Sequence, residues 1–314
     1  MSIAPTLPQA APLSTPPRLA VIGCGLMGGS FAMALRAACK PRGWTLHISA
    51  HSRSRASGER ALELGIVDEV HPSAAQAVRD ADLVLLAVPV TATEATLREL
   101  GPALPSQALV MDVGSTKRDV VVAARAALGA AAAQFVPAHP IAGRERGGID
   151  QADATLYQAR RCIITPLAEN DPQRLQRAQS VWEAVGCRVV HMSAEQHDRT
   201  FAAVSHLPHL LAFAYVNAVS QQPDAARHLA LAGPGFRDFS RIAAGTSAIW
   251  RDIFSANRDE VLEQLSHFEA ALGQWRAALD TKNDAEVARL VDAASAVRTH
   301  WTLNGATPPT DDPA

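Results

Sequence analysis

The sequence has no excess of positive charge, since 29 Lys and Arg residues stand against 31 Asp and Glu residues, for a formal net charge of −2. Proteins that bind nucleic acid generally need a basic surface to neutralise phosphates. The composition therefore argues against general affinity for DNA or RNA, and we expect no nucleic-acid partner.

Cysteine is scarce as well. The four cysteines lack CxxC spacing, which argues against a disulfide framework and against a clustered metal site; they are Cys24, Cys39, Cys162 and Cys187. We expect free, buried thiols in a reducing cytoplasm and no metal ligands.

Long apolar runs are missing too. No uninterrupted run of about 18 apolar residues is present, so we predict no membrane span and no membrane partner. Residues 1–16 are rich in Pro, Ala and Ser and lack the basic start of a signal peptide. We expect a flexible tail there and a cytoplasmic protein.

What the chain does contain is a regular alternation of short apolar runs and helical patterns up to about residue 190. Continuous apolar strands alternating with helices are typical of a parallel sheet covered on both faces. The predicted strands are 18–24, 46–50, 83–90, 109–114, 135–140, 162–166 and 187–193.

After residue 194 the pattern is helical throughout. We predict an α/β Rossmann-type domain with a mainly parallel sheet, followed by an all-α dimerisation domain. The expected bounds are a tail at 1–16, a dinucleotide-binding domain at 17–192, a helical domain at 193–304 and a tail at 305–314. Helices within 247–301 carry more apolar stripes than one small bundle readily buries, which predicts a homodimer through the helical domain.

The stretch "VIGCGLMGGS" contains a GxGxxG motif directly after an apolar strand and at the start of a helix. In that context the motif predicts dinucleotide binding. The first glycine allows a tight turn, the second admits the pyrophosphate and the third lets the helix pack on the strand. The predicted cofactor contacts are Gly23, Gly25, Leu26, Met27 and Gly28. A glycine turn in a fold that no longer binds cofactor is the alternative.

The second strand ends in "HISAHSRSR", which has no acidic residue. An NAD enzyme normally places Asp or Glu near here to bind the ribose hydroxyls. Ser52 is neutral, and Arg53 has a guanidinium suited to phosphate oxygens. Arg55 adds charge. We therefore predict NADP as cofactor, with NAD less favoured; a basic surface loop without a special role is the alternative.

Two further segments end strands at the same edge of the predicted sheet. "DVGSTKRDVV" contains Ser115, which is either a helix cap or a substrate contact. "PAHPIAGRERGG" contains His139 at a strand end. A histidine beside a nicotinamide is suited to accept the proton of an alcohol during hydride transfer, so we predict a catalytic role for His139.

The helix predicted around residues 197–209 has polar residues in line. Asp198, Ser205 and His209 fall on one face, where a core helix would carry large apolar residues. This favours a lined pocket; a hydrogen-bonded seam between helices is the alternative. Pro208 is expected to kink the helix and free a carbonyl one turn back.

The segment 233–253 contains an arginine among aromatic and small residues. Arg241 is a candidate anchor for a substrate carboxylate, and Trp250 lies in the same segment. A surface salt bridge explains the arginine equally well.

Taken together, the motifs "VIGCGLMGGS", "DVGSTK", "HPIAGRERGG", "HDRTFAAVSHLPH" and "GFRDFSRIAAGTSAIWRDI" resemble the prephenate/arogenate dehydrogenase family of tyrosine biosynthesis. They span roughly residues 18–256 in the family's order. The resemblance implies a Rossmann domain and a helical dimer domain. The implied reaction is oxidative decarboxylation of prephenate or arogenate, with hydride transfer to the nicotinamide, loss of CO2 and aromatisation.

The resemblance also implies residue roles. His139 matches the histidine that takes the 4-hydroxyl proton, and Ser115 matches the serine that orients this hydroxyl. The residues implied at the substrate are Ser205, His209, Arg241, Glu145, Asp198 and Trp250. The resemblance further leads us to expect neither a C-terminal ACT domain nor an N-terminal chorismate mutase segment.

Two other interpretations stay open at this point. One is another two-domain dehydrogenase of the β-hydroxyacid or pyrroline-carboxylate type, which shares the glycine loop but is not expected to combine "HPIAG" with "SHLPH". The other is a non-catalytic NADP-sensing protein. The sequence does not decide between prephenate and arogenate.

Overall fold

The computed structural model describes residues 17–144 and 146–302. The chain divides into two compact units, the first ending at Asn257 and the second beginning at Arg258.

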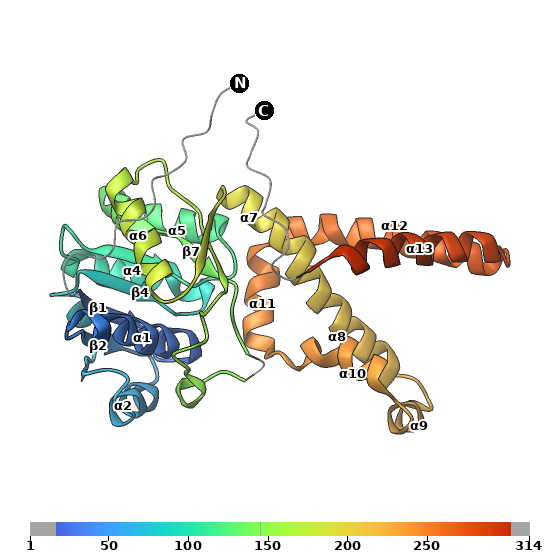
Figure 1. Ribbon diagram of the computed structural model, residues 1–314, viewed down its shortest axis with the longest axis horizontal. Coiled ribbons are helices and arrows are strands. Elements are labelled where there is room, and N and C mark those ends of the chain that lie inside the picture. The colour runs from blue at the N-terminus through green and yellow to red at the C-terminus, as the bar shows by residue number, and fades with distance from the viewer. Residues whose placement is uncertain (1–16, 145, 303–314) are drawn as a thin grey trace. The chain divides into compact units, whose positions relative to one another are not determined.

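The first unit is built on a six-stranded sheet with the order β3-β2-β1-β4-β5-β6 (Figure 1). Every neighbouring pair is parallel, which confirms the predicted sheet. The strands are β1 (Arg18–Ile22), β2 (His47–His51), β3 (Glu69–Val70), β4 (Leu83–Leu86), β5 (Leu109–Asp112) and β6 (Phe135–Val136). The sequence analysis missed β3, whose two residues are too few to show a pattern.

A second, three-stranded sheet follows in the chain. It consists of β7 (Ala138–Pro140), β8 (Arg161–Ile164) and β9 (Arg188–His191). The single strand predicted over 135–140 is wrong in this respect, because it divides at Pro137 between the two sheets. β7 runs antiparallel to β8, and its His139 lies opposite Ile163.

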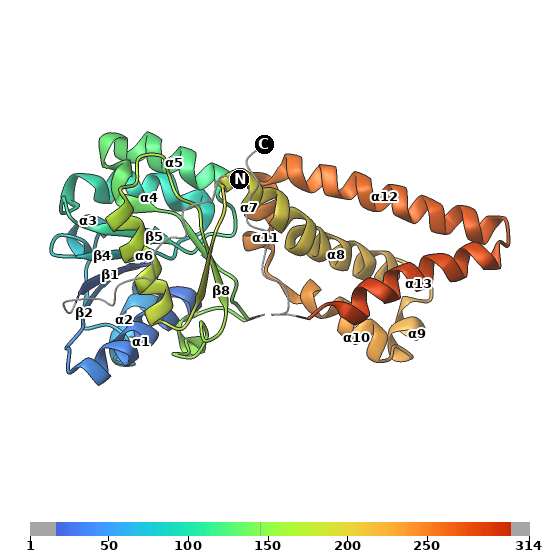
Figure 2. The same cartoon turned by 45° about the horizontal axis from the view of Figure 1, so that its top comes forward.

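Helices cover both faces of the six-stranded sheet. The helices up to β9 are α1 (Leu26–Cys39), α2 (Arg55–Glu63), α3 (Ala74–Ala77), α4 (Thr93–Leu100), α5 (Arg118–Leu128) and α6 (Pro172–Ala184). Along β1, Leu19 and Val21 face a core shared with α1 and α6. Ala20 and Ile22 face the opposite core, shared with α3, α4 and α5 (Figure 2). Alternate residues of each strand are therefore buried on opposite faces.

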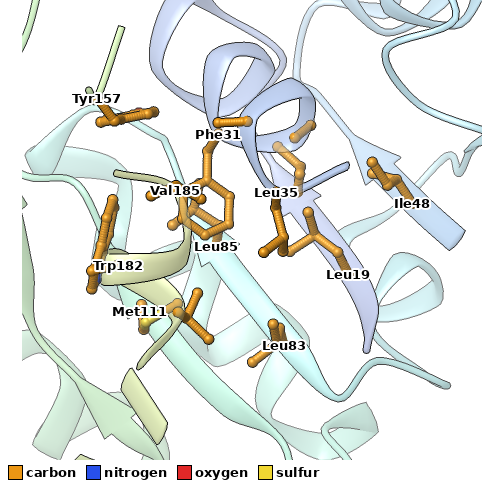
Figure 3. Close-up of a cluster of buried hydrophobic side chains, with 14 of the residues drawn as sticks. Leu19, Phe31, Leu35, Ile48, Leu83, Leu85, Met111, Tyr157, Trp182 and Val185 are labelled. Atoms are coloured by element: carbon orange, nitrogen blue, oxygen red, sulfur yellow. The ribbon is translucent and has the colours of Figure 1, made fainter. Parts of the chain in front are cut away.

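Aromatic side chains occupy the first of these two cores. Phe31 of α1 lies beside Trp182 of α6 in the core (Figure 3), with ring centroids 5.0 Å apart in an edge-to-face arrangement. Tyr157 packs edge-on against both rings, and its hydroxyl donates a hydrogen bond to the carbonyl of Met27 at 2.8 Å. This cluster holds α1, and with it the glycine loop, against the sheet.

After β9 the first unit is helical. Its remaining helices are α7 (Ala194–Phe201), α8 (Leu207–Ser220), α9 (Ala225–Ala230), α10 (Pro234–Ser240) and α11 (Ser247–Ala256). α7 begins with a capping box, in which Ser193 accepts from the amide of Gln196 and the Gln196 side chain accepts from the amide of Ser193. Such reciprocal capping satisfies two orphan amides and fixes the helix start.

The helix is irregular next to Pro208. A π-helical turn, Ala202–His206, joins α7 to α8, and it widens the backbone just ahead of the proline. The imidazole Nδ1–H of His209 donates to the carbonyl of Ser205 at 2.9 Å. The backbone thus absorbs the missing proline amide by widening over five residues.

By length and composition alone, the continuous helical segment Ala194–Ser220 could cross a membrane. The sequence analysis credited no such segment, because its polar residues interrupt the apolar run. The same test is passed by core helices of soluble proteins. His197 and Asp198, near the start of this segment, are fully buried in the first unit, whereas 17% of its most apolar 18-residue window is buried, so the expected absence of a membrane span stays a prediction.

The second unit is a helical hairpin of α12 (Arg258–Asp280) and α13 (Asp284–His300). Asn283 caps α13 by accepting from the amide of Glu286 at 3.1 Å. Many large apolar side chains on the hairpin are exposed, among them Leu262, Leu272, Leu279, Val291 and Val297.

All four cysteines are free and buried, as expected. Burial raises the pKa of the Cys24 thiol to about 11, because the thiolate is poorly solvated there. This thiol is therefore protonated at neutral pH and contributes to the core.

Candidate active site

The glycine loop connects β1 to α1 at the carboxyl edge of the sheet. Gly23 has a φ of 110°, and a Cβ there would lie 2.4 Å from the carbonyl oxygen of Ala87. A Cβ on Gly28 would lie 2.3 Å from the carbonyl oxygen of Gly23. Gly23 therefore makes the turn and Gly28 the close contact between helix and strand.

The start of α1 can hold a pyrophosphate. Gly25 is the N-cap and makes no side-chain hydrogen bond, and the first turn of α1 has no acidic residue. A Cβ on Gly25 would meet nothing within 4 Å, so the backbone there is open to a ligand. Free amides at a helix N-terminus, together with the helix dipole, favour an anion.

The residues at the end of β2, where an NAD enzyme would have an acidic residue, differ in the contacts that they make. Ser52 is partly buried directly after β2, and Arg53 is exposed. Among the described residues Arg53 forms no hydrogen bond or ion pair. The guanidinium of Arg55, by contrast, is 2.7 Å from Glu59 on the next turn of α2. Arg53 is thus the better placed of the two arginines for a phosphate.

A buried ion pair ties together the ends of β5 and β7. The Nζ of Lys117 lies 2.6 Å from Oδ2 of Asp112, and the lysine side chain is fully buried. Oδ1 of Asp112 accepts from the amide of Ala138 at 2.8 Å, and Oδ2 accepts from the amide of Gly114. This network places His139, the next residue, at the carboxyl edge of the sheet.

His139 belongs to a chain of three side chains. Its Nδ1 is 2.8 Å from Nε2 of His197, and Nδ1 of His197 is 2.8 Å from Oδ1 of Asp198. His197 and Asp198 are fully buried, whereas His139 is partly exposed. The ring of Phe201 packs against both imidazoles, with centroids 4.9 and 4.5 Å away.

Burial determines the protonation states of His139 and His197. It holds the pKa of His139 well below its usual value, and the neighbouring His197 and Lys117 lower it further. The pKa of His197 is also lowered, chiefly by burial, although Asp198 opposes this. Both imidazoles are therefore uncharged at neutral pH. An uncharged histidine has one ring nitrogen free to accept a proton.

Asp198 lies in a seam between α7 and the start of α5. Oδ1 accepts from the amide of Lys117 at 2.8 Å, and Oδ2 accepts from the amide of Arg118 at 2.9 Å. Burial would raise the pKa of Asp198, but these bonds and the one from His197 outweigh it and hold the pKa below its usual value. Asp198 is thus an ionised, fully engaged carboxylate.

The other residues implied at the substrate lie on α8, α11 and the connection before it. The ring of His209 stacks on Trp250, with centroids 3.7 Å apart. Ser205 and Ser115 are partly buried, and Arg241 is exposed. Glu145 lies outside the described residues. Among the described residues, the structure shows no hydrogen bond from the side chain of Ser115 or Ser205 to His139.

Three buried residues of this site were missed by sequence reasoning. His197, Lys117 and Asp112 lie within quoted motifs but were given no role. The signal that could have found His197 is the His-Asp pair at the start of a helix, and that signal is weak without the neighbours. Lys117 and Asp112 carry opposite charges at a strand end, which is a common surface pattern as well.

Comparison with known proteins identifies the family to which the chain belongs. Residues 31–191 match the family described as prephenate dehydrogenase, nucleotide-binding domain, and residues 193–293 match prephenate dehydrogenase, dimerization domain. The glycine loop precedes the first matched range, so its assignment rests on the geometry above.

Individual relatives extend the match. The chain is 36% identical over 267 residues to a cyclohexadienyl dehydrogenase of Zymomonas mobilis, covering 84% of this chain and 89% of the relative. A crystal structure of prephenate dehydrogenase from A. aeolicus in complex with hydroxyphenyl propionate and NAD+ has 34% identity and a TM-score of 0.84, covering 91% of this chain and 98% of that one. Synechocystis arogenate dehydrogenase has 28% identity and a TM-score of 0.76, covering 91% and 100%. The chain therefore belongs to the prephenate, cyclohexadienyl and arogenate dehydrogenase family of tyrosine biosynthesis.

Proposed function

We propose that, within the prephenate/arogenate dehydrogenase activity of its family, this chain uses His139 as the catalytic base and NADP as the preferred cofactor. The observation that carries the proposal is an uncharged, partly exposed His139 at the sheet edge where the glycine loop also ends. Family membership excludes the alternatives of a β-hydroxyacid dehydrogenase and a pyrroline-carboxylate reductase. A non-catalytic sensor remains an outcome of the activity test.

In the proposed reaction the bound nicotinamide supplies the hydride acceptor. Nε2 of His139 takes the proton of the substrate 4-hydroxyl while hydride leaves ring C4, and the O–H electron pair becomes the carbonyl bond. Loss of CO2 then returns an electron pair to the ring, and the protonated His139 gives its proton back to the phenolate oxygen. The histidine ends the cycle unchanged.

The remaining residues are assigned to binding and orienting the substrate. We assign Ser115 to the substrate hydroxyl, and Ser205, His209 and Arg241 to polar groups of the substrate. Glu145 and Trp250 complete the proposed site, whereas the fully buried Asp198 belongs to it only through its hydrogen bond with His197. The relative from A. aeolicus was crystallised with hydroxyphenyl propionate, which has the ring and side-chain carboxylate that such contacts would serve.

Steady-state turnover tests the function directly. Purified protein is assayed with prephenate and with arogenate, each with NAD and NADP, by the absorbance of the reduced nicotinamide. We expect turnover of at least one substrate with release of CO2. Cofactor binding without turnover of either substrate would instead identify a sensor.

The cofactor proposal predicts a switch at Ser52. NADP is expected to exceed NAD in kcat/KM by about 10- to 150-fold, the effect of one charge-assisted contact. Ser52→Asp should reverse the preference, because a carboxylate accepts from free ribose hydroxyls and repels the 2′-phosphate. Arg53→Ala should weaken NADP more than NAD, whereas Arg55→Ala, whose side chain pairs with Glu59, should change the ratio less. Equal kcat/KM for both cofactors in the native enzyme would refute this assignment.

Arg241 is proposed to anchor the substrate carboxylate. Arg241→Ala is expected to raise the KM for substrate about 10-fold or more, in line with the loss of a hydrogen bond to a charged group. The KM for cofactor should change little. An unaltered substrate KM would assign Arg241 to the structure of the helical region only.

We further propose that residues 193–304 form the substrate and dimerisation domain of a cytoplasmic homodimer. The matched dimerization domain and the exposed apolar side chains of α12 and α13 support this. Sedimentation at micromolar concentration should give a dimer. A monomer at that concentration would contradict the proposal.

A further inference from the structure

We infer that His197 is a positioning residue for the reaction, which, with Asp198 behind it, holds His139 in the one tautomer that leaves Nε2 free to accept a proton. The inference rests on the proposed function of His139 and extends it to a fully buried residue behind it. The hydrogen-bond chain Asp198–His197–His139, with two distances of 2.8 Å, carries it.

The direction of each hydrogen bond follows from the carboxylate. Asp198 is ionised and can only accept, so Nδ1 of His197 must carry the proton that points at it. His197 is uncharged, so its Nε2 has a lone pair and no proton. Nδ1 of His139 must then donate to that Nε2. The proton of neutral His139 is thereby placed on Nδ1, and Nε2 is left as the base.

Neighbouring groups fix the geometry of the hydrogen-bond chain Asp198–His197–His139. The Asp198 carboxylate is held by the two backbone amides at the start of α5, so it cannot rotate away from His197 without losing them. Phe201, one turn after His197 on the same helical segment, packs against both imidazole rings. The Asn257 side chain also donates to the carbonyl of Asp198 at 2.8 Å. The orientation is therefore fixed before substrate binds.

The same hydrogen-bond chain stabilises His139 once it is protonated. When the 4-hydroxyl proton arrives on Nε2, His139 becomes an imidazolium whose Nδ1–H already donates to His197. The negative charge of Asp198 lies at the far end of that hydrogen-bonded pair. A carboxylate that orients a histidine and stabilises its imidazolium is a recurrent arrangement in hydrolases. Here an additional imidazole separates the two.

Two substitutions at His197 distinguish a role in positioning His139 from a purely structural role. In His197→Leu the acceptor is lost, and kcat is expected to fall by about 10- to 10³-fold, a part of the contribution of a general base. In His197→Gln the amide oxygen can take the place of Nε2 and accept from His139, so kcat should lie within about 10-fold of the native value. The KM for cofactor should be unchanged in both. Equal kcat in the two variants would overturn the inference.

Nitrogen NMR tests the tautomer without any turnover. In protein with 15N-labelled histidine, the His139 signals, assigned by their loss in His139→Asn, should show Nδ1 protonated and Nε2 unprotonated at neutral pH. In His197→Leu they should shift toward the Nε2-protonated form, while His191→Leu, a change on β9, should leave them unchanged. An Nε2-protonated His139 in the native protein overturns the inference. If the native tautomer is as expected but neither substrate turns over, the proposed function fails and the positioning stands.

Discussion

Replacement of His139 by asparagine is expected to lower kcat by about 10²–10⁴-fold, the usual contribution of a general base. The asparagine amide can lie near the former Nδ1 and still donate to His197. It has no atom at the position of Nε2, so the substrate hydroxyl loses its proton acceptor. Because the side chain is smaller and still hydrogen-bonded, the KM for cofactor should change little. Steady-state kinetics at saturating cofactor measures both quantities.

A matched control uses a second histidine of the same small sheet. His191 lies on β9, and its Nε2 contacts the Gln179 side chain at 3.3 Å. His191→Asn removes a partly buried imidazole of similar size outside the proposed site, and kcat should stay near native. A near-native kcat in His139→Asn would remove the assignment of the base.

The pH dependence of the native enzyme follows from the direction of the His139 pKa. Burial lowers this pKa well below the usual value of 6.5, and the neutral form is the active one. Activity should therefore be fully present at and above the usual histidine pKa, and should be lost only as the pH falls well below it. An acid limb at or above pH 6.5 would require a charged His139 in the free enzyme, contrary to its burial.

The sequence predicted those parts of the site that depend on neighbours along the chain. The glycine loop is local, because a turn, a close approach and a helix start follow one another within residues 23–28. His139 was found for the same reason, at the end of an apolar run. His197 was not found, because its role depends on a contact to a residue 58 positions away. A buried hydrogen-bond acceptor such as His197 produces no periodic pattern in the sequence.

The same distinction explains the differences in the fold. Continuous apolar runs predicted the parallel strands, since each strand is buried on both faces. The division of 135–140 at Pro137 and the change of strand direction in β7 are set by pairing with β8, which lies more than 20 residues later. The π-helical turn before Pro208 likewise has no local sequence signal, and His206 within it contacts Asn257, 51 positions away.

The second large effect is expected in stability, at the buried pair of Lys117 and Asp112. Lys117→Met keeps the length of the side chain but leaves the Asp112 carboxylate buried without its cation. Breaking a buried ion pair from one side costs about 3–5 kcal/mol. Chemical unfolding in urea should show a decrease of that size. At an unfolding entropy of about 2.1 cal/mol/K per residue, 1 kcal/mol corresponds to about 1.5 °C for a chain of 314 residues, so Tm should fall by roughly 5–8 °C.

The double variant Lys117→Met/Asp112→Asn distinguishes an unpaired charge from lost packing. It removes the charge together with its partner, while the oxygen of the introduced amide can still accept from one of the two backbone amides that now bind Asp112, those of Ala138 and Gly114. We expect the double variant to be more stable than Lys117→Met alone, since the buried charge is gone. All proteins are compared at one concentration, because subunit association alters apparent stability. If the two substitutions instead destabilise additively, Lys117 and Asp112 contribute independently, and the ion pair does not hold β7 and His139 at the end of β5.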